Sequence, residues 1–360
     1  MSRVKDPLKV FILGAGSIGS LLAHDLKQQF AGSGVVKPIF LLRSYENSKE
    51  NKIVKLRRLY DTAELTKSEV EISGRTEAVL GNETIDNLII TTKSFQTEVA
   101  LQPYINRLSL TANILILQNG MGMADSLIGK FWQSSTLKPN IFEAITTHGV
   151  FKDQRGIVNH ISRGVIKIGQ QQQQQQQQQE QADDLPLLIR AILETPNLNA
   201  EYVPYEEFIL LQMEKLIVNC CINPLTALYN VTNGHLLFGK EIVHIWRSII
   251  CECVDMFWLE YPILEKIPTA RSFLNQNRLL DSVISVCRLT GSNSSSMRQD
   301  VRSLRNTEIG NINGHIAYLG RKHGKATFSN SMLTSLVKSK LSIDRGIEKA
   351  AAESIIDRAS

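Results

Sequence analysis

The chain has 360 residues, of which 43% are hydrophobic and 21% are charged, and its formal net charge is +5. This length and composition are typical of a soluble globular protein with two domains of ordinary size. The mild positive charge suits an anionic ligand, but it is not by itself a signature of nucleic-acid binding.

The first predicted element is a short β-rich run at residues 9–13, which a G-x-G-x-x-G sequence and an amphipathic segment from residue 18 to about residue 30 follow directly. The first glycine permits a tight turn, the second lets the backbone approach a pyrophosphate, and the third lets helix and strand pack closely. The helix N-terminus then attracts the phosphate charge. We therefore predict dinucleotide binding by the loop, and the alternative is a purely structural glycine turn. The loop positions are Gly14, Ala15, Gly16, Ser17, Ile18 and Gly19.

The next predicted strand, residues 38–42, ends directly before Arg43. An NAD-binding fold usually has Asp or Glu at this point to bind the ribose 2′-hydroxyl, whereas Arg suits a 2′-phosphate. Arg43 therefore predicts NADP(H) as the cofactor, and the alternative is an ordinary surface arginine.

Two further buried strands of the parallel type are expected at residues 87–92 and 114–118. Lys93 follows the first of them and Asn119 follows the second. Since ligands of a doubly wound sheet lie outside the carboxyl ends of its strands, we expect both side chains to be directed towards the crevice of the glycine loop.

The pattern then predicts one strand at residues 141–150 and a hairpin of residues 156–161 and 165–169 around a turn at 162–164. The low-complexity glutamine tract that follows, residues 170–184, is predicted to be a disordered surface insertion, because long loops add little closure entropy. A glutamine-rich interaction segment is the alternative.

From about residue 205 the apolar spacing changes to helical periods. Helices are predicted near residues 206–229, 240–261, 270–288, 296–322 with a break, 330–340 and 344–358. The fold class is therefore α/β, with a Rossmann-type doubly wound sheet in residues 1–205 and an all-helical domain in residues 206–360.

The first of these helices has a polar ladder, because Lys215, Asn219 and Asn223 are four residues apart and share one face. Buried amides and ammoniums are costly unless a partner satisfies them, and this set suits a small anion such as a carboxylate. Pro224 cannot donate to the carbonyl of Cys220, and the resulting kink could turn Asn223 outwards. The alternative is a core helix with snorkelling polar residues.

Other polar residues of the helical half are candidates for the same site. The serine run 294–296 suits a helix N-cap, where free N–H groups can bind an anion, and a plain cap is the alternative. Asn233 follows the ladder helix, and Glu308 is either functional or a solvated helix carboxylate.

The five cysteines have neither metal-ligand spacing nor a secreted disulfide pattern, and no histidine motif indicates a metal. The short start of the chain leaves no room for a signal peptide, and we expect no stretch long and uncharged enough to span a bilayer. A cytoplasmic protein without nucleic-acid or membrane partners is predicted.

Taken in order, these segments resemble the ketopantoate reductase (2-dehydropantoate 2-reductase) family over nearly the whole chain, apart from the glutamine tract and the C-terminal tail. The blocks K-x-x-x-N-x-x-x-N-P-L-T-A and S-S-M-x-Q-D-x-x-x-x-x-x-T-E-I are the specific ones. The matching segments are GAGSIG at 14–19, Lys93, NGMG at 119–122, TTHG at 146–149, KLIVNCCINPLTAL from Lys215, NG from Asn233 and SSSMRQDVRSLRNTEIGNING from Ser294. The departures, which are the glutamine insertion, a long charged tail and the histidine of Asn-Gly-His at 233–235, remove no functional side chain.

The resemblance implies a Rossmann domain followed by a helical domain like that of 6-phosphogluconate dehydrogenase. It implies NADPH-dependent reduction of 2-dehydropantoate to (R)-pantoate, in pantothenate and coenzyme A synthesis. By the same resemblance Lys215 is the proton donor, and Glu308 contacts the cofactor and the catalytic region. Substrate positions are Lys215, Asn219, Asn223, Asn233, Asn293 and Ser296, and further cofactor positions are Arg43, Lys93, Asn119 and Val150.

Two other functions stay open on the sequence. One is an NADPH-dependent reductase of another 2-oxo acid, and the other is a non-catalytic relative that acts as a protein or RNA interaction factor. A monomer or a homodimer is expected.

Overall fold

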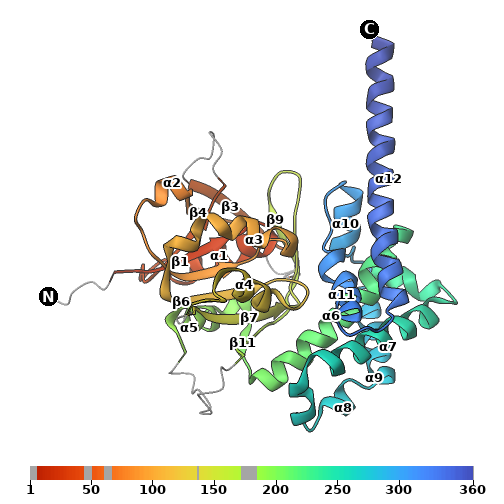
Figure 1. Ribbon diagram of the computed structural model, residues 1–360. Helices are drawn as coiled ribbons and strands as arrows, with labels where there is room; N and C mark the ends of the chain where they lie inside the picture. The colour runs from red at the N-terminus through yellow and green to blue at the C-terminus, as the bar shows by residue number, and fades with distance from the viewer. Residues whose placement is uncertain (1–5, 44–50, 61–66, 136–137, 172–184, 360) are drawn as a thin grey trace. The chain divides into compact units, whose positions relative to one another are not determined.

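The computed structural model describes residues 6–43, 51–60, 67–135, 138–171 and 185–359, and the chain divides into two compact units (Figure 1). The first unit comprises Met1–Gln118 and Gly122–Phe208, and the second comprises Asn119–Met121 and Ile209–Ser360. The predicted insertion at residues 170–184 lies outside the described residues from residue 172 onward.

The described part of the first unit is built on one sheet of eleven strands in the order β11-β10-β7-β6-β5-β1-β2-β4-β3-β9-β8. Its central strands, β7, β6, β5, β1, β2 and β4, pair in parallel, as a doubly wound fold requires. The strands are β1 (Leu8–Leu13), β2 (Val36–Leu41), β3 (Asn51–Arg58), β4 (Lys67–Arg75), β5 (Ile85–Ile90), β6 (Leu108–Leu117), β7 (Asn140–Thr146), β8 (Gly149–Lys152), β9 (Val158–Ser162), β10 (Ile166–Gly169) and β11 (Ala200–Tyr202).

Helices cover both faces of this sheet, so its central strands are apolar on both sides. In β1, Val10 and Ile12 pack into the core on the side of helices α1 and α5, whereas Phe11 and Leu13 pack on the side of α4. The helical segments of this unit are α1 (Ser17–Gln29), α2 (Glu77–Leu80), η1 (Ser94–Gln96), α3 (Thr97–Leu101), η2 (Gln102–Arg107), α4 (Met123–Phe131), α5 (Leu187–Leu193) and η4 (Pro196–Leu198).

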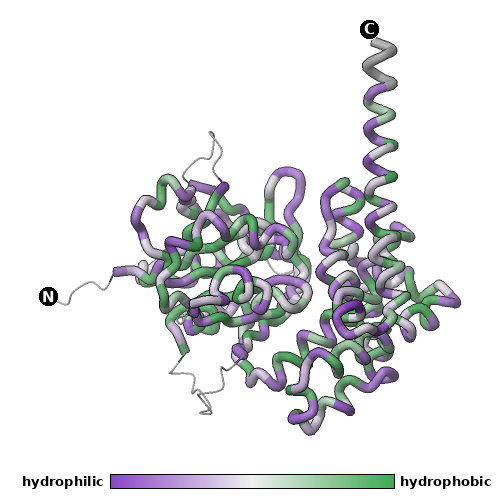
Figure 2. Tube along the Cα trace, viewed as in Figure 1, coloured by the Kyte–Doolittle hydropathy of each residue, from purple (hydrophilic) through white to green (hydrophobic). Residues whose placement is uncertain are grey.

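The predicted strand at 141–150 is wrong, because the chain turns at Thr147 and His148 and forms two strands, β7 and β8. The predicted hairpin of 156–161 and 165–169 is also wrong. Strand β9 pairs with β3 and β8, whereas β10 pairs with β7 and β11. The true hairpin joins β8 to β9 through a hydrophilic turn (Figure 2), where Oδ1 of Asp153 accepts from the backbone N–H of Arg155 and of Ile157.

A buried polar network fills the space between α1 and the strands β3, β4 and β9. Asp25 on α1 accepts from Arg58 at 2.6 Å and lies 2.8 Å from the Nδ1 of His24. Arg58 also contacts the Nδ1 of His160, and Nε2 of His160 lies 2.9 Å from the Nδ1 of His148. All five side chains are buried. The network therefore fixes α1, whose N-terminus carries the glycine loop, against the outer strands.

The hydrogen bonds of this network require neutral imidazoles at positions 148 and 160. His148 accepts at Nδ1 from the backbone N–H of Gly164 and donates at Nε2 to the carbonyl of Leu198. Burial lowers the pKa of His160 to about 4, and it also lowers the pKa of His148. The neighbouring Arg58 acts in the same direction on both, while Asp25 opposes it.

We predict that the free energy of unfolding falls as the pH decreases from about 6.5 to about 4. In this window the unfolded chain binds protons at both histidines while the folded chain does not, so acid favours unfolding. For His160 the shift corresponds to roughly 3 kcal/mol, since one pKa unit is about 1.4 kcal/mol. Urea unfolding of the wild type and of His160→Gln at several pH values tests this. Equal pH slopes for the two proteins would contradict it.

The regular elements of the second unit are helices throughout the part of the chain that the structure describes, and the longest are α6, α7 and α12. Helix α12 is one continuous helix, so the separate helices predicted at 330–340 and 344–358 are wrong, and its C-terminal end extends beyond the other helices of its unit (Figure 1). The segments are α6 (Tyr205–Tyr229), η5 (Asn233–Phe238), α7 (Ile242–Glu260), η6 (Pro262–Lys266), α8 (Ala270–Phe273), α9 (Gln276–Leu289), α10 (Ser296–Arg302), η7 (Ile309–Asn311), α11 (Asn313–Lys322) and α12 (Phe328–Ala359).

Helix α6 passes through Pro224 without ending, because other helices satisfy the backbone near the proline. The carbonyl of Cys220, which Pro224 cannot bond, accepts from the Asn313 side chain of α11 at 3.1 Å. The carbonyl of Cys221 accepts from the Trp246 indole of α7 at 3.0 Å. Side-chain donors from other helices therefore satisfy the carbonyls near the proline, and α6 continues past the position where a kink was predicted.

Contrary to expectation, α6 is also long and apolar enough to cross a membrane by length and composition alone. In its most apolar window 72% of the residues are buried inside the protein, which is the property of a core helix. A core position explains the apolar composition of α6, because a helix enclosed by protein carries apolar residues on most of its faces.

Candidate active site

The glycine loop is shaped by close backbone packing at two of its three glycines. Gly14 has a φ of +116°, and its carbonyl accepts at 2.7 Å from the hydroxyl of Thr91, the residue that follows β5. A Cβ on Gly19 would lie 1.9 Å from the Gly14 carbonyl oxygen, so any side chain there would displace the loop. A Cβ on Gly16 would meet nothing within 4 Å, and the backbone there is open to an approaching group.

The N-terminus of α1, which begins at Ser17, has no side-chain cap. Gly16 is the N-cap residue, and the first turn contains no acidic residue. Ala15 and Gly16 are exposed, so N–H groups at this end are left to solvent or to a ligand. This is the arrangement that binds a phosphate at a helix N-terminus.

The predicted cofactor residues Arg43 and Lys93 follow the carboxyl ends of β2 and β5, which flank β1 on its two sides. Arg43 is exposed, and Lys93 is half-buried. Val150 lies on β8 and packs against the core on the α1 side of the sheet. Three of the four further predicted cofactor residues therefore belong to the same unit as the glycine loop.

In the second unit the ladder of α6 has the predicted helical spacing, with Asn223 buried and Lys215 and Asn219 half-buried. Although Lys215 keeps some accessible surface, the atoms packed around it desolvate the ammonium and lower its pKa to about 8. The negative charge of Glu308 opposes this decrease. The ammonium is thus placed where it can release a proton near neutral pH.

Glu308 is buried, and its Oε2 accepts from the Nδ2 of Asn119 at 3.2 Å. Asn119 is the fourth predicted cofactor residue, and the segment Asn119–Met121 packs as part of the second unit. Gly120, with a φ of +95°, brings this segment so close to Asn311 that a Cβ would lie 2.6 Å from the Asn311 carbonyl oxygen. Lys215, Glu308 and Asn119 therefore form one connected polar group.

The remaining predicted substrate residues gather where α6, η5 and α10 meet. The backbone N–H of Asn233 donates to the Asn293 carbonyl at 3.1 Å, and the Asn233 side chain donates to Thr290 at 2.9 Å. The Oδ1 of Asn233 is buried and has no hydrogen-bond partner in the described part of the chain. Ser296 is exposed at the start of α10.

The cap of α10 is Ser295, whose hydroxyl accepts from the backbone N–H of Arg298 at 3.1 Å. The same hydroxyl lies 2.7 Å from the hydroxyl of Thr226 on α6. The capping interpretation of the serine run is therefore correct for Ser295. The bond to Thr226 fixes Ser296 relative to the ladder helix, and Thr226 is a positioning residue that the sequence alone did not reveal.

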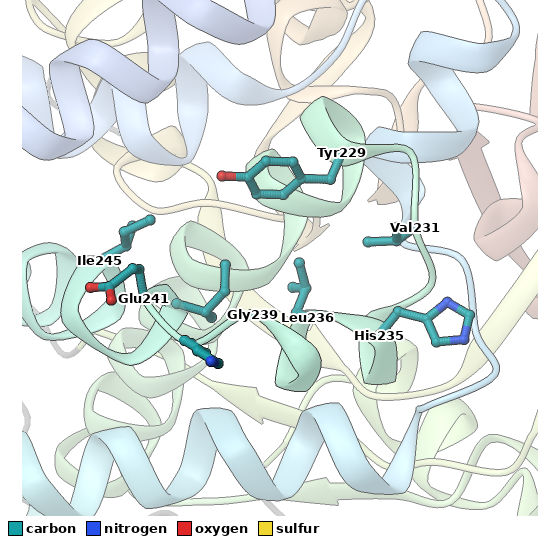
Figure 3. A pocket seen from close by; sticks show the side chains of 9 residues that line it. Tyr229, Val231, His235, Leu236, Gly239, Glu241 and Ile245 are labelled. Carbon is teal, nitrogen blue, oxygen red and sulfur yellow. The ribbon is translucent and has the colours of Figure 1, made fainter.

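A separate cavity of about 480 Å³ lies beside η5, at the end of α6 and the start of α7 (Figure 3). Tyr229, Val231, Leu236 and Ile245 make its lining mostly apolar, and no ladder residue lines it. His235, Lys240 and Glu241 also line it, but none of the predicted substrate residues does. The candidate site is therefore the polar group of Lys215 and its neighbours.

The sheet and the glycine loop define a dinucleotide-binding class of protein. Both this unit and the helical unit match the models of one family. The family described as "Ketopantoate reductase PanE/ApbA" matches residues 10–173, and the one described as "Ketopantoate reductase PanE/ApbA C terminal" matches residues 207–341. The chain belongs to the ketopantoate reductase family.

Individual relatives can be aligned with this chain over nearly its whole length. A "Probable 2-dehydropantoate 2-reductase" of Schizosaccharomyces pombe is 36% identical over 341 residues, which are 93% of this chain and 97% of that one. A solved "Probable 2-dehydropantoate 2-reductase" from Bacillus subtilis has a TM-score of 0.69 at 25% identity and covers 92% of this chain and all of its own. A D-mandelate dehydrogenase with NADH and anilino(oxo)acetate has a TM-score of 0.74 at 22% identity, covering 93% and 99%.

Proposed function

We propose that the protein catalyses the NADPH-dependent reduction of 2-dehydropantoate to (R)-pantoate, in pantothenate and coenzyme A biosynthesis. Family membership and the relatives named 2-dehydropantoate 2-reductase support this activity. The observation that carries it is the polar group of the second unit, in which a lysine with a pKa of about 8 is electrostatically coupled to a buried carboxylate.

The chemistry requires a proton donor beside a ketone oxygen. When bound, NADPH supplies the hydride to the ketone carbon. The Lys215 ammonium gives its proton to the oxygen, which becomes the hydroxyl of the product. Glu308 keeps the ammonium charged before transfer, because its negative charge raises the pKa of Lys215. Asn119 holds the Glu308 carboxylate in position through its hydrogen bond.

The substrate is a hydroxylated 2-oxo acid, so its site needs groups for a carboxylate and for a distal hydroxyl. Asn219 and Asn223 share the ladder face with Lys215 and supply amide donors. Ser296 and Asn293 supply further polar groups at the start of α10. A substrate hydroxyl would provide a donor for the Oδ1 of Asn233, which has none within the described chain.

The loss of NADPH absorbance, with and without 2-dehydropantoate, tests the proposal directly. Oxidation that depends on this substrate is the expected result. Folded protein that oxidises NADPH no faster with the substrate than without it would refute the proposed activity. The same assay is run with a panel of other 2-oxo acids, which includes an aryl 2-oxo acid. A D-mandelate dehydrogenase shares the fold, and the fold alone does not determine which 2-oxo acid is reduced.

The choice of NADP(H) over NAD(H) rests on Arg43, the exposed residue that follows β2 at the position of the ribose 2′-substituent. We expect Arg43→Asp to lower kcat/KM for NADPH and to leave NADH less affected, because a carboxylate repels a 2′-phosphate and accepts from a 2′-hydroxyl. The ratio of the two kcat/KM values is measured. An unchanged ratio would remove Arg43 from this role.

A cytoplasmic location and a monomeric or homodimeric state complete the proposal. The five cysteines are free thiols, as a reducing compartment favours. Light scattering on the purified protein distinguishes the two assemblies.

A further inference from the structure

Lys152, the last residue of β8, lies against the glycine loop. Its Nζ donates to the carbonyl of Ala15 at 3.1 Å and to the Ser20 hydroxyl at 3.5 Å. Ala15 lies in the glycine loop before α1 and Ser20 lies near the start of α1, so the ammonium stands at the end of the helix where a phosphate is expected. None of the motifs that indicate the cofactor site includes this lysine.

Strand geometry places a second lysine on the same side of the sheet. Residues two apart in a strand share a face, so Lys152 lies on the face of Val150, which packs on the α1 side. On β3 the residues Val54 and Leu56 also pack on the α1 side, and Lys52 shares their face. Lys152 is exposed as a whole residue, but partial desolvation of its ammonium lowers its pKa. The positive charge of Lys52 lowers it further, because the two ammoniums repel each other.

This arrangement is electrostatically unfavourable when no ligand is present. A cation at a helix N-terminus meets the positive end of the helix dipole. Neither Lys152 nor Lys52 forms an ion pair with a carboxylate in the part of the chain that the structure describes. An anion bound at the N-terminus of α1 would offset the helix dipole and both lysine charges at once.

We propose that Lys152, supported by the charge of Lys52, is a phosphate-binding residue of the nucleotide site. The proposal rests on the proposed function, since it assigns the residue to the same NADP(H) site. The group bound is a phosphate of the dinucleotide, either the pyrophosphate or the 2′-phosphate. One of the three N–H donors of the ammonium remains for it beside the bonds to Ala15 and Ser20.

The experiment compares Lys152→Gln, Lys152→Arg and the wild type by measuring the Kd of NADPH and of NADH from nucleotide fluorescence. Lys55→Gln is the matched control, because Lys55 is also a strand lysine but lies on the opposite face of β3 in an exposed pair with Glu69. We expect Lys152→Gln to raise the Kd of NADPH about tenfold, Lys152→Arg to stay within a few-fold, and Lys55→Gln to change nothing measurable.

The two nucleotides separate the two phosphate sources. Equal weakening of NADPH and NADH assigns Lys152 to the pyrophosphate, and selective weakening of NADPH assigns it to the 2′-phosphate. A Kd within twofold of the wild type for both nucleotides overturns the proposal. A lower Tm of the ligand-free Lys152→Gln protein with unchanged nucleotide affinity overturns it too, because the lysine then only fixes the loop. Failure of the wild type to bind either nucleotide would instead refute the proposed function.

Discussion

Lys215→Ala is expected to lower turnover by roughly two to four orders of magnitude, the span usual for the loss of a general acid. The variant removes both the proton and the positive charge from the ketone oxygen on which negative charge develops. Steady-state kcat with saturating 2-dehydropantoate is the measurement, and Lys338→Ala on the exposed face of α12 is the matched control. A kcat within a few-fold of the wild type would remove Lys215 from the role of proton donor.

The pH dependence of the wild type provides a second readout for the same residue. Because the pKa of Lys215 is about 8 and the acid must be protonated to act, activity should fall as the pH rises through about 8. Glu308→Gln removes the charge that raises this pKa, so the fall should move to lower pH. An unchanged profile in that variant would show that another group titrates.

Asp25→Ala is expected to have the largest effect on stability, with a loss of about 3–5 kcal/mol in the free energy of unfolding. The substitution leaves the Arg58 guanidinium in the interior without its carboxylate, and the side chains of the pair are 10% and 0% exposed. Urea unfolding measures the effect. Because the network fixes α1, nucleotide affinity should fall in the same variant.

Two comparisons decide whether the buried charge is the cause. Glu69→Ala breaks the exposed pair with Lys55 and should cost at most about 1 kcal/mol. Asp25→Ala combined with Arg58→Met removes both charges and should recover part of the stability, since an apolar side chain of similar length needs no carboxylate. A loss in Asp25→Ala no greater than that in Glu69→Ala would contradict the expected effect.

Local patterns in the sequence predicted much of the fold. The strand, glycine loop and helix at the start are specified by residues adjacent in the chain, and the helical half is specified by apolar spacing. The strand errors arose where pairing is non-local. The apolar run at 141–150 reads as one strand, whereas Gly164 packs so tightly that a Cβ would lie 2.4 Å from the backbone nitrogen of His148, at the point where the chain turns. No feature of the run itself indicates that approach.

The residues of the candidate site also divide into those that local sequence reveals and those that depend on non-local contacts. Lys215, Asn219 and Asn223 are visible as a ladder because helix geometry relates residues four apart. Thr226 and Lys152 were missed, because their roles depend on contacts with Ser295 and Ala15, which are distant in the sequence. The alternation of Val150 and Lys152 could have indicated the lysine, but the predicted strand ended at Val150.

The hydrogen bonds around Pro224 have a further consequence for the spacing of the ladder. Asn219 and Asn223 stand immediately before a position where an isolated helix would bend, and their separation depends on donors from two other helices. Asn313 of α11 also donates to Asn330 of α12, so α6, α11 and α12 are joined at one buried point. On the proposed function, the spacing of the substrate-binding amides therefore depends on Trp246 and Asn313, which lie on other helices.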